Sequence, residues 1–175
     1  MKKILIMLLV ATASLTACKK DDDKKKEEAT GGNATVTAGN YGFDGGNAGK
    51  FSSTKAGMVQ VTAAGQTTFT VTAIRDGGNE SITIILLQKA AVGKYRIGPQ
   101  DDNGGIMISK DYAKAGDAAL NYSTDLSGTN MAGGGEINIT KVEGNTVEGT
   151  FYAVAYNGNQ KEAFAEQGSF KGILK

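Results

Sequence analysis

Histidine and tryptophan are absent from this chain of 175 residues, which contains one proline and one cysteine. Without histidine, the chain lacks the usual general base of enzymes and a preferred zinc ligand. The single cysteine cannot form a disulfide within the chain. We therefore expect no metal site, no cofactor and no histidine-assisted nucleophile, and a fold held together by its apolar core.

Neither sign of charge is in large excess. The chain has 19 Lys and Arg against 18 Asp and Glu, for a formal net charge of +1. Nucleic-acid-binding domains carry a basic excess that neutralises phosphates. The balance therefore predicts no nucleic acid partner.

Residues 1–17 have the parts of a secretory signal. Lys2 and Lys3 form a positive start, an apolar run follows from Ile4 through Val10, and small residues lead to Cys18. The apolar run is about half of the roughly 20 residues that a membrane-spanning helix needs. We therefore interpret residues 1–17 as a signal peptide and not as a membrane helix.

Leu15-Thr16-Ala17-Cys18 resembles the lipobox of bacterial lipoproteins. The resemblance implies cleavage before Cys18, lipidation of Cys18 and attachment to a membrane through the N-terminal lipid, since two acyl chains suffice for stable anchoring. It predicts a lipoprotein of the outer membrane, exposed either to the periplasm or at the cell surface. The alternative, a small buried cysteine, fits poorly with a position directly after a signal core.

The segment 18–49 is predicted to be a tether and linker. Residues 19–28 carry five positive and five negative charges and no apolar side chain, so they have nothing to bury. This tract resembles the surface-export signal of Bacteroidota lipoproteins, although a plain charged spacer would look similar. Residues 29–49 are rich in Gly, Asn, Ala and Thr and continue the tether or form a loose edge.

From residue 50 to residue 175, apolar and polar side chains alternate with a period of two. No stretch has a convincing helical period. The pattern predicts one all-β domain, an antiparallel β-sandwich or flattened barrel of about nine or ten strands, mostly connected by hairpins. The candidate strands are 58–62, 68–73, 81–87, 95–97, 106–108, 120–122, 136–140, 146–156 and 162–174.

One hairpin allows its register to be predicted. Ile137 and Ile139 share one face of their strand, and Phe151 lies on an apolar face of the next. These faces meet if the loop between the strands has an odd number of residues, such as Glu143–Asn145; a two-residue loop would turn one apolar set to water. We expect Phe170 to join the same core.

Three short motifs carry a family resemblance. They are a Gly-x-Ile-x-Ile-Thr strand at Gly135–Thr140, a Gly-Thr-Phe strand at Gly149–Phe151 and a closing Gly-x-Phe at Gly168–Phe170. They resemble a family of small Bacteroidota lipoproteins of unknown function, most clearly over residues 120–172. The resemblance implies an all-β lipoprotein and brings no catalytic residues with it.

Carboxylates are the remaining route to catalysis. Glycosidases need two carboxylates roughly 5–10 Å apart, and sequence spacing cannot select such a pair. Counting by twos from Phe164 to Phe170 places Glu166 on the apolar face of its strand. Either Glu166 is a buried functional acid, or a bulge around Gln167-Gly168 turns it outward; the glycine favours the bulge.

Two further patterns have ordinary structural explanations. Ser52-Ser53-Thr54-Lys55 matches a Ser-x-x-Lys nucleophile motif, but that motif requires a helix N-terminus and this segment has strand-like surroundings. Asp101–Gly104 and Asp44–Asn47 contain oxygen ligands for calcium, but the same residues are typical of turns and lack the alternating spacing of a calcium loop. We interpret Asp101–Gly104 and Asp44–Asn47 as turns.

Tyr152 and Tyr156 fall on the strand face opposite Phe151. Tyrosines on a sheet surface can stack on sugar rings or contact another protein, unless a second layer covers them. The first function hypothesis is therefore a membrane-anchored lipoprotein whose non-catalytic domain binds a protein or a glycan at the cell envelope. The alternative is a small carboxylate-dependent hydrolase anchored to the outer membrane.

Overall fold

The computed structural model describes residues 32–46 and 48–175. Ten strands and one short 3-10 turn account for the regular structure of these residues, which include no α-helix. In chain order they are β1 (Ala34–Phe43), β2 (Gly49–Ala63), β3 (Gln66–Ile74), β4 (Ser81–Leu86), β5 (Gly93–Ile97), β6 (Gly104–Ser109), η1 (Tyr112–Lys114), β7 (Asn121–Ser123), β8 (Gly134–Glu143), β9 (Thr146–Tyr156) and β10 (Glu162–Ile173).

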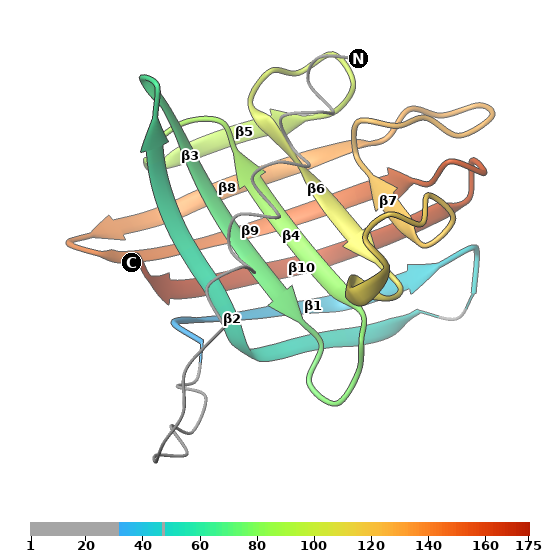
Figure 1. Ribbon diagram of the computed structural model, residues 1–175, viewed down its shortest axis with the longest axis horizontal. Helices are drawn as coiled ribbons and strands as arrows, with labels where there is room; N and C mark the ends of the chain where they lie inside the picture. Colours follow the sequence, from blue (N-terminus) through green and yellow to red (C-terminus); the bar gives the residue numbers. More distant parts are fainter. Residues whose placement is uncertain (1–31, 47) are drawn as a thin grey trace, which may run out of the picture. The chain divides into compact units, whose positions relative to one another are not determined.

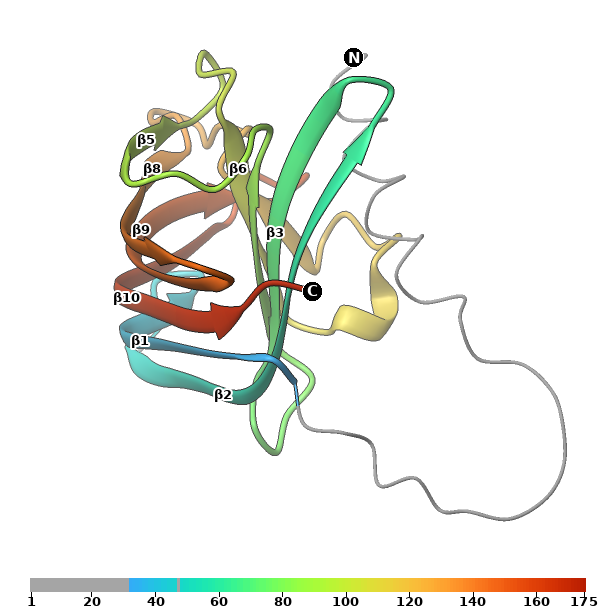
Figure 2. The same ribbon diagram turned by 90° about the vertical axis from the view of Figure 1, so that its left-hand side faces the viewer.

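Eight of the ten strands form a closed antiparallel barrel, in the order β1-β2-β3-β4-β6-β7-β9-β10, with β10 paired back to β1. Figure 1 shows that β3, β4 and β6 run diagonally across β8, β9, β10 and β1, and that β2 bends from one layer into the other. Figure 2 shows the same two layers from the side. The predicted all-β fold is confirmed, in its flattened-barrel form.

β8 and β5 are the two strands outside the barrel. β9 pairs with β10 along one edge, and its other edge pairs with β8 along most of its length and with β7 at one position, Ser123 opposite Tyr156. β5 then pairs with the far edge of β8. β8, β9, β10 and β1 therefore form a continuous sheet surface on the outside of the barrel.

Side chains fill the inside of the barrel. An eight-stranded barrel is just wide enough for its own inward-facing side chains. Large residues with almost no exposure form this core, among them Met58, Phe51, Phe69, Tyr122, Ile82, Ile84, Ile106 and Ile108. Ile137, Ile139, Phe151 and Phe170 belong to the same cluster, as predicted.

In the hairpin between β8 and β9, the apolar residues face the same side as predicted, but the loop has a different length. The predicted three-residue loop is wrong, because Glu143 pairs with Thr146 and the loop is Gly144-Asn145. Gly144 has φ +56°, which suits the first position of a tight hairpin turn. The register then shifts at Thr140, the extra residue of a bulge. A two-residue loop alone would turn Ile139 and Phe151 to opposite faces of the sheet. The one inserted residue brings the two apolar faces back to the same side.

The linker prediction for residues 18–49 is wrong from Ala34 onward. β1 occupies Ala34–Phe43 and closes the barrel by pairing with both β2 and β10. Its inward residues Ala34, Val36 and Ala38 are buried, but they are small and carry a weak hydrophobic signal. The predicted signal peptide, Cys18 and the charged tract lie outside the described residues. No helix in the described part is long and apolar enough to cross a membrane.

Candidate functional site

The outer faces of β8, β9 and β10 enclose a solvent-open groove of about 370 Å³. Tyr152 stands in this groove and is 51% exposed, as expected for an aromatic on the outer face. Its hydroxyl has no hydrogen-bond partner among the described residues. The groove is lined by Glu136, Asn138, Thr150, Phe151, Tyr152, Gln167, Gly168 and Ser169.

A bulge in β10 shapes the wall of the groove beside Tyr152. Ala165 pairs with Ala153 and Gly168 pairs with Phe151, so two residues of β10 oppose Tyr152 alone. Gln167 adopts φ +51°, a left-handed conformation that is rare outside glycine. Its side chain lies over Gly39 of β1, where an added Cβ would come within 2.6 Å of the Gln167 Oε1 atom.

The same bulge decides between the two interpretations of Glu166. Glu166 is exposed, and its Oε2 atom accepts a hydrogen bond of 2.5 Å from Nδ2 of Asn40. The buried-acid interpretation is wrong, and the bulge interpretation is confirmed. The alternation along β10 pointed to the interior because the inserted residue shifts the facing of every residue before it.

Tyr156 is not an exposed aromatic. It is 5% exposed, and its Oη atom donates a hydrogen bond of 3.1 Å to Oε2 of Glu162. The connection between β7 and β8 covers its ring, since an added Cβ at Gly128 would lie 2.4 Å from ring atom Cε1. Burial raises the pKa of Tyr156. Tyr156 was a candidate binding residue unless another layer covered it. The loop between β7 and β8 covers it, so Tyr156 is not available for binding.

A second groove, of about 310 Å³, adjoins the first across β9 and β10. The two grooves share Thr150 and Ser169. The second groove is lined mainly by hydroxyl and charged side chains, with Thr35, Thr37, Thr140, Glu148 and Lys171 joining the shared pair. The hollow surface therefore runs across four neighbouring strands, from β8 to β1.

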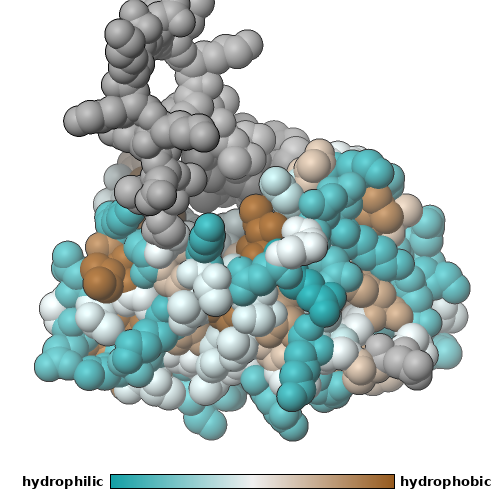
Figure 3. All heavy atoms as spheres, turned by 90° about the horizontal axis from the view of Figure 1, so that it is seen from below, coloured by the Kyte–Doolittle hydropathy of each residue, from teal (hydrophilic) through white to brown (hydrophobic). Residues whose placement is uncertain are grey.

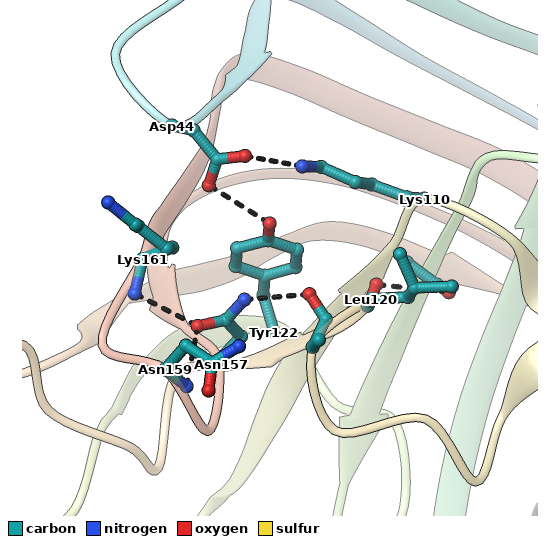
Figure 4. Close-up of polar contacts among 9 residues, drawn as sticks. Asp44, Lys110, Leu120, Tyr122, Asn157, Asn159 and Lys161 are labelled. Carbon is teal, nitrogen blue, oxygen red and sulfur yellow. Dashed lines mark hydrogen bonds and ion pairs between the residues drawn. The ribbon is translucent and has the colours of Figure 1, made fainter.

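A polar cluster closes one end of the barrel (Figure 4). Tyr122 of β7 is 1% exposed, and its Oη atom donates a hydrogen bond of 3.0 Å to Oδ1 of Asp44. Lys110 pairs with the other oxygen of Asp44. The Lys110 Nζ atom also lies 5.3 Å from the ring centroid of Phe43, within cation–π range. The cluster ties the turn after β1 to β7 and to the segment that precedes it.

The electrostatics of this cluster favour fixed charge states. Partial burial opposes ionisation of Asp44, but hydrogen bonds from Lys110 and Tyr122 outweigh it and lower its pKa. The hydrogen bond to Asp44 raises the pKa of Lys110, and burial raises the pKa of Tyr122. A general acid or base works best with a pKa near the ambient pH. The shifts move away from neutrality, so the arrangement is suited to stabilising the fold.

A family model described as a domain of unknown function (DUF6252) matches residues 43–173, and this match covers three quarters of the chain. The chain belongs to the DUF6252 family. The match includes both grooves apart from their β1 residues, and it includes all three members of the Asp44 cluster. No curated protein and no solved structure matches the chain.

Asn157 joins the two sides of the barrel seam in this DUF6252 domain. Its Nδ2 atom donates to the carbonyl of Ala119 at 2.7 Å, and its Oδ1 atom accepts from the backbone N–H groups of Asn159 and Lys161 at 2.9 Å each (Figure 4). β7 and β9 share a single paired position next to it. Asn157 therefore supplies hydrogen bonds where the strand ladder is shortest.

Sequence reasoning missed Asn157 and the Asp44 cluster because their partners are far apart in the chain. Asp44 was interpreted as a turn residue, and its φ of +57° agrees with that. Nothing in its local pattern indicated Lys110 or Tyr122. Ser52-Ser53-Thr54-Lys55 lies within β2, so its serine and lysine are not one helical turn apart. Among the described residues no group of three or more acidic, His or Cys side chains could hold a metal ion.

Proposed function

We propose that this DUF6252 protein is a lipid-anchored lipoprotein of the outer membrane whose barrel binds a ligand, without catalysis, in the groove around Tyr152. The observation that carries the proposal is a half-exposed tyrosine, with no hydrogen-bond partner among the described residues, in a surface groove that several hydroxyl and amide side chains line. The interior of the barrel is filled by its core, so a ligand has to bind on the outer surface.

The anchoring part of the proposal rests on the sequence before the barrel. The positive start, the apolar run and Leu15–Cys18 together favour lipidation of Cys18. Cys18→Ser removes the acylated thiol, so the variant should appear in the soluble fraction or remain as the uncleaved precursor. A processed Cys18→Ser protein that still sediments with membranes would contradict the anchor. Added protease should cleave the protein on whole cells if it is displayed at the surface.

The non-catalytic part rests on the acidic residues. A hydrolase that uses two carboxylates needs one of them to hold its proton near neutral pH. Hydrogen bonds from Thr54 lower the pKa of Asp76, and a hydrogen bond from Lys141 lowers that of Glu143. The pKa of Asp44 is lowered as well. These shifts keep the three carboxylates ionised at neutral pH, so none of the three is suited to be the proton donor of a hydrolase.

Retention on isolated cell envelopes tests the proposal. The acyl chains of Cys18 would hold the protein on membranes by themselves, so the assay uses the soluble Cys18→Ser protein. This protein should bind an envelope preparation, and the additional Tyr152→Ala change should reduce retention strongly because truncation of an aromatic anchor removes much of the affinity. Tyr112→Ala is the matched control, since Tyr112 is 44% exposed and lies outside both grooves. Equal retention of the Tyr152→Ala and Tyr112→Ala variants, or no retention of the Cys18→Ser protein itself, would refute the proposed site. Hydrolysis abolished by Glu136→Gln or Glu166→Gln would establish the hydrolase instead.

A further inference from the structure

The walls of the two adjoining grooves consist mostly of hydroxyl and amide side chains. Asn138 lies on β8, Thr150 on β9, and Gln167 and Ser169 on β10, with Thr37 of β1 beyond them. Amides both donate and accept hydrogen bonds, and hydroxyls do the same. Sugar hydroxyls also donate and accept hydrogen bonds, so each of these side chains can donate to a sugar hydroxyl or accept from it.

Several of these groups are available for a ligand. Within the described part of the chain, the side chains of Asn138 and Gln167 and the hydroxyl of Tyr152 make no hydrogen bond. Ser169 and Thr37 bond to each other at 2.9 Å, which leaves acceptor capacity on both oxygens. A ligand with several hydroxyls would find donors and acceptors distributed along the groove.

Tyr152 supplies the apolar part of a sugar site. A tyrosine combines a large apolar ring with a polar tip, and a sugar ring has an apolar C–H face with polar edges. Glu136 lies directly across from Tyr152 on β8, and the Glu166–Gln167 bulge lies on its other side. Polar groups therefore flank the ring on both sides, where the edges of a stacked sugar would be.

The charges of the grooves indicate an uncharged ligand. The Glu136 carboxylate lies 3.6 Å from Nζ of Lys94, and the Glu148 carboxylate lies 3.1 Å from Nζ of Lys171. Each carboxylate is thus balanced by a cation of the same surface, and neither groove has a net charge from these pairs. An anionic ligand would need an excess of Lys or Arg.

A protein partner fits this surface less well. Protein interfaces have an apolar core within a polar rim, but the exposed side chains of Val61, Val92 and Met131 lie outside both grooves. Figure 3, which looks at the barrel from another side, shows hydrophilic side chains with hydrophobic ones in small separate groups. Among the aromatic residues that line the grooves, only Tyr152 exposes its ring, and hydroxyl and amide side chains lie beside it, as expected of a sugar platform.

The length of the surface exceeds one sugar ring. Strands in a sheet are about 4.8 Å apart, so β8, β9, β10 and β1 together span about 14 Å. The shared residues Thr150 and Ser169 make the two grooves continuous over this distance. A short chain of sugars can contact the whole surface, whereas a monosaccharide would contact only one groove.

We propose that the two grooves bind an uncharged oligosaccharide that lies across β8, β9, β10 and β1, with one sugar ring stacked on Tyr152. This inference rests on the proposed function, because it names the ligand class of the same site. Asn138 and Gln167 hydrogen-bond the sugar hydroxyls next to the stacked ring.

A glycan array tests the ligand class with the purified full-length protein in detergent. The array contains neutral oligosaccharides of hexoses, pentoses and N-acetylhexosamines, each as a mono-, di- and trisaccharide series, together with anionic glycans. Wild-type protein should bind neutral members, and affinity should rise from mono- to trisaccharide. Tyr152→Ala should weaken binding by roughly 30-fold, and Tyr112→Ala should leave it unchanged.

Gln167→Gly separates binding from folding. Glycine suits the φ of +51° at this position, so the melting temperature should not fall. Loss of the amide should still weaken neutral glycan binding by roughly 2- to 12-fold, the range for one hydrogen bond. Unchanged binding by Gln167→Gly would remove that residue from the site.

Treated envelopes distinguish failure of this inference from failure of the proposed function. If the ligand is a neutral glycan, retention should survive protease treatment of the envelopes and be lost after periodate, which cleaves the vicinal diols of sugars. Loss of retention after protease, a preference for anionic glycans, or an array without any neutral ligand would overturn the inference of an oligosaccharide ligand. If retention still depended on Tyr152, the proposed binding site would nevertheless stand. Retention that does not depend on Tyr152 would overturn both.

Discussion

The contact between Gly168 and Phe151 offers a quantitative test of the sheet register. The β10 bulge places Gly168 opposite Phe151, and an added Cβ at Gly168 would lie 2.6 Å from both Cε1 and Cζ of the ring. Gly168 does not have a positive φ, so the backbone itself accepts alanine. Gly168→Ala should therefore act by overpacking and lower the free energy of unfolding by about 1–3 kcal/mol.

Removal of the ring has a larger and separate cost. Phe151 is 4% exposed. A buried aromatic covers at least about 150 Å², which at about 25 cal/mol per Å² corresponds to about 4 kcal/mol. Measured Phe→Ala changes in cores cost about 3–5 kcal/mol, in agreement. This is a large part of the about 5–15 kcal/mol that typically stabilises a domain.

The double variant should be more stable than the sum of the two effects predicts. In Phe151→Ala, the methyl group introduced by Gly168→Ala enters volume that the ring has left. The cost of Gly168→Ala should then fall to about zero, which gives a coupling energy of about 1–3 kcal/mol. Urea unfolding followed by far-UV circular dichroism measures all four free energies.

Gly116→Ala provides the control for this cycle. An added Cβ at Gly116 has no neighbour within 4 Å, so its effect should be independent of Phe151. If Gly168→Ala and Phe151→Ala also add to within about 0.5 kcal/mol, the ring does not lie against Gly168 and the register across the bulge is wrong.

Three further predictions concern stability. Tyr41→Phe should raise the free energy of unfolding in urea by about 1 kcal/mol, because the buried Tyr41 hydroxyl has no partner among the described residues; a loss of stability would contradict this. Asn157→Ala should cost at least about 2 kcal/mol in the same assay, since it removes three hydrogen bonds of a buried side chain at the seam. Asp44 has a lower pKa when folded than unfolded, so its contribution is present above about pH 4 and is lost as the pH falls further. Thermal unfolding of Asp44→Asn should consequently depend less on pH in the acid range, and an unchanged pH profile would exclude this role.

Local alternation predicted those strands in which large apolar residues recur every second position. The strand predicted at 146–156 has the bounds of β9, because Phe151 and its inward neighbours alternate with polar residues between two turns. β1 escaped prediction because Ala34, Val36 and Ala38 are small. Its burial depends on β2 and β10, which lie far away in the sequence.

Features set by distant contacts could not be predicted in the same way. Alternation placed Tyr152 and Tyr156 on one face, but it carries no information on the loop that covers Tyr156 at Gly128. The Asp44 cluster likewise joins three segments that only the closed barrel brings together. The predicted odd loop in the β8–β9 hairpin failed because a bulge elsewhere in the ladder, at Thr140, corrects the parity.

The position of Glu166 in the sequence and the groove at Tyr152 have one structural cause. A regular β10 would turn Glu166 into the core, where an unpaired carboxylate is costly. One inserted residue turns Glu166 outward and keeps Phe170 inside. The same insertion sets two residues of β10 against Tyr152 and lays Gln167 over Gly39, which forms one wall of the groove. A charged residue on an otherwise apolar strand face thus indicated the position of the proposed binding site, although its own carboxylate is not needed there.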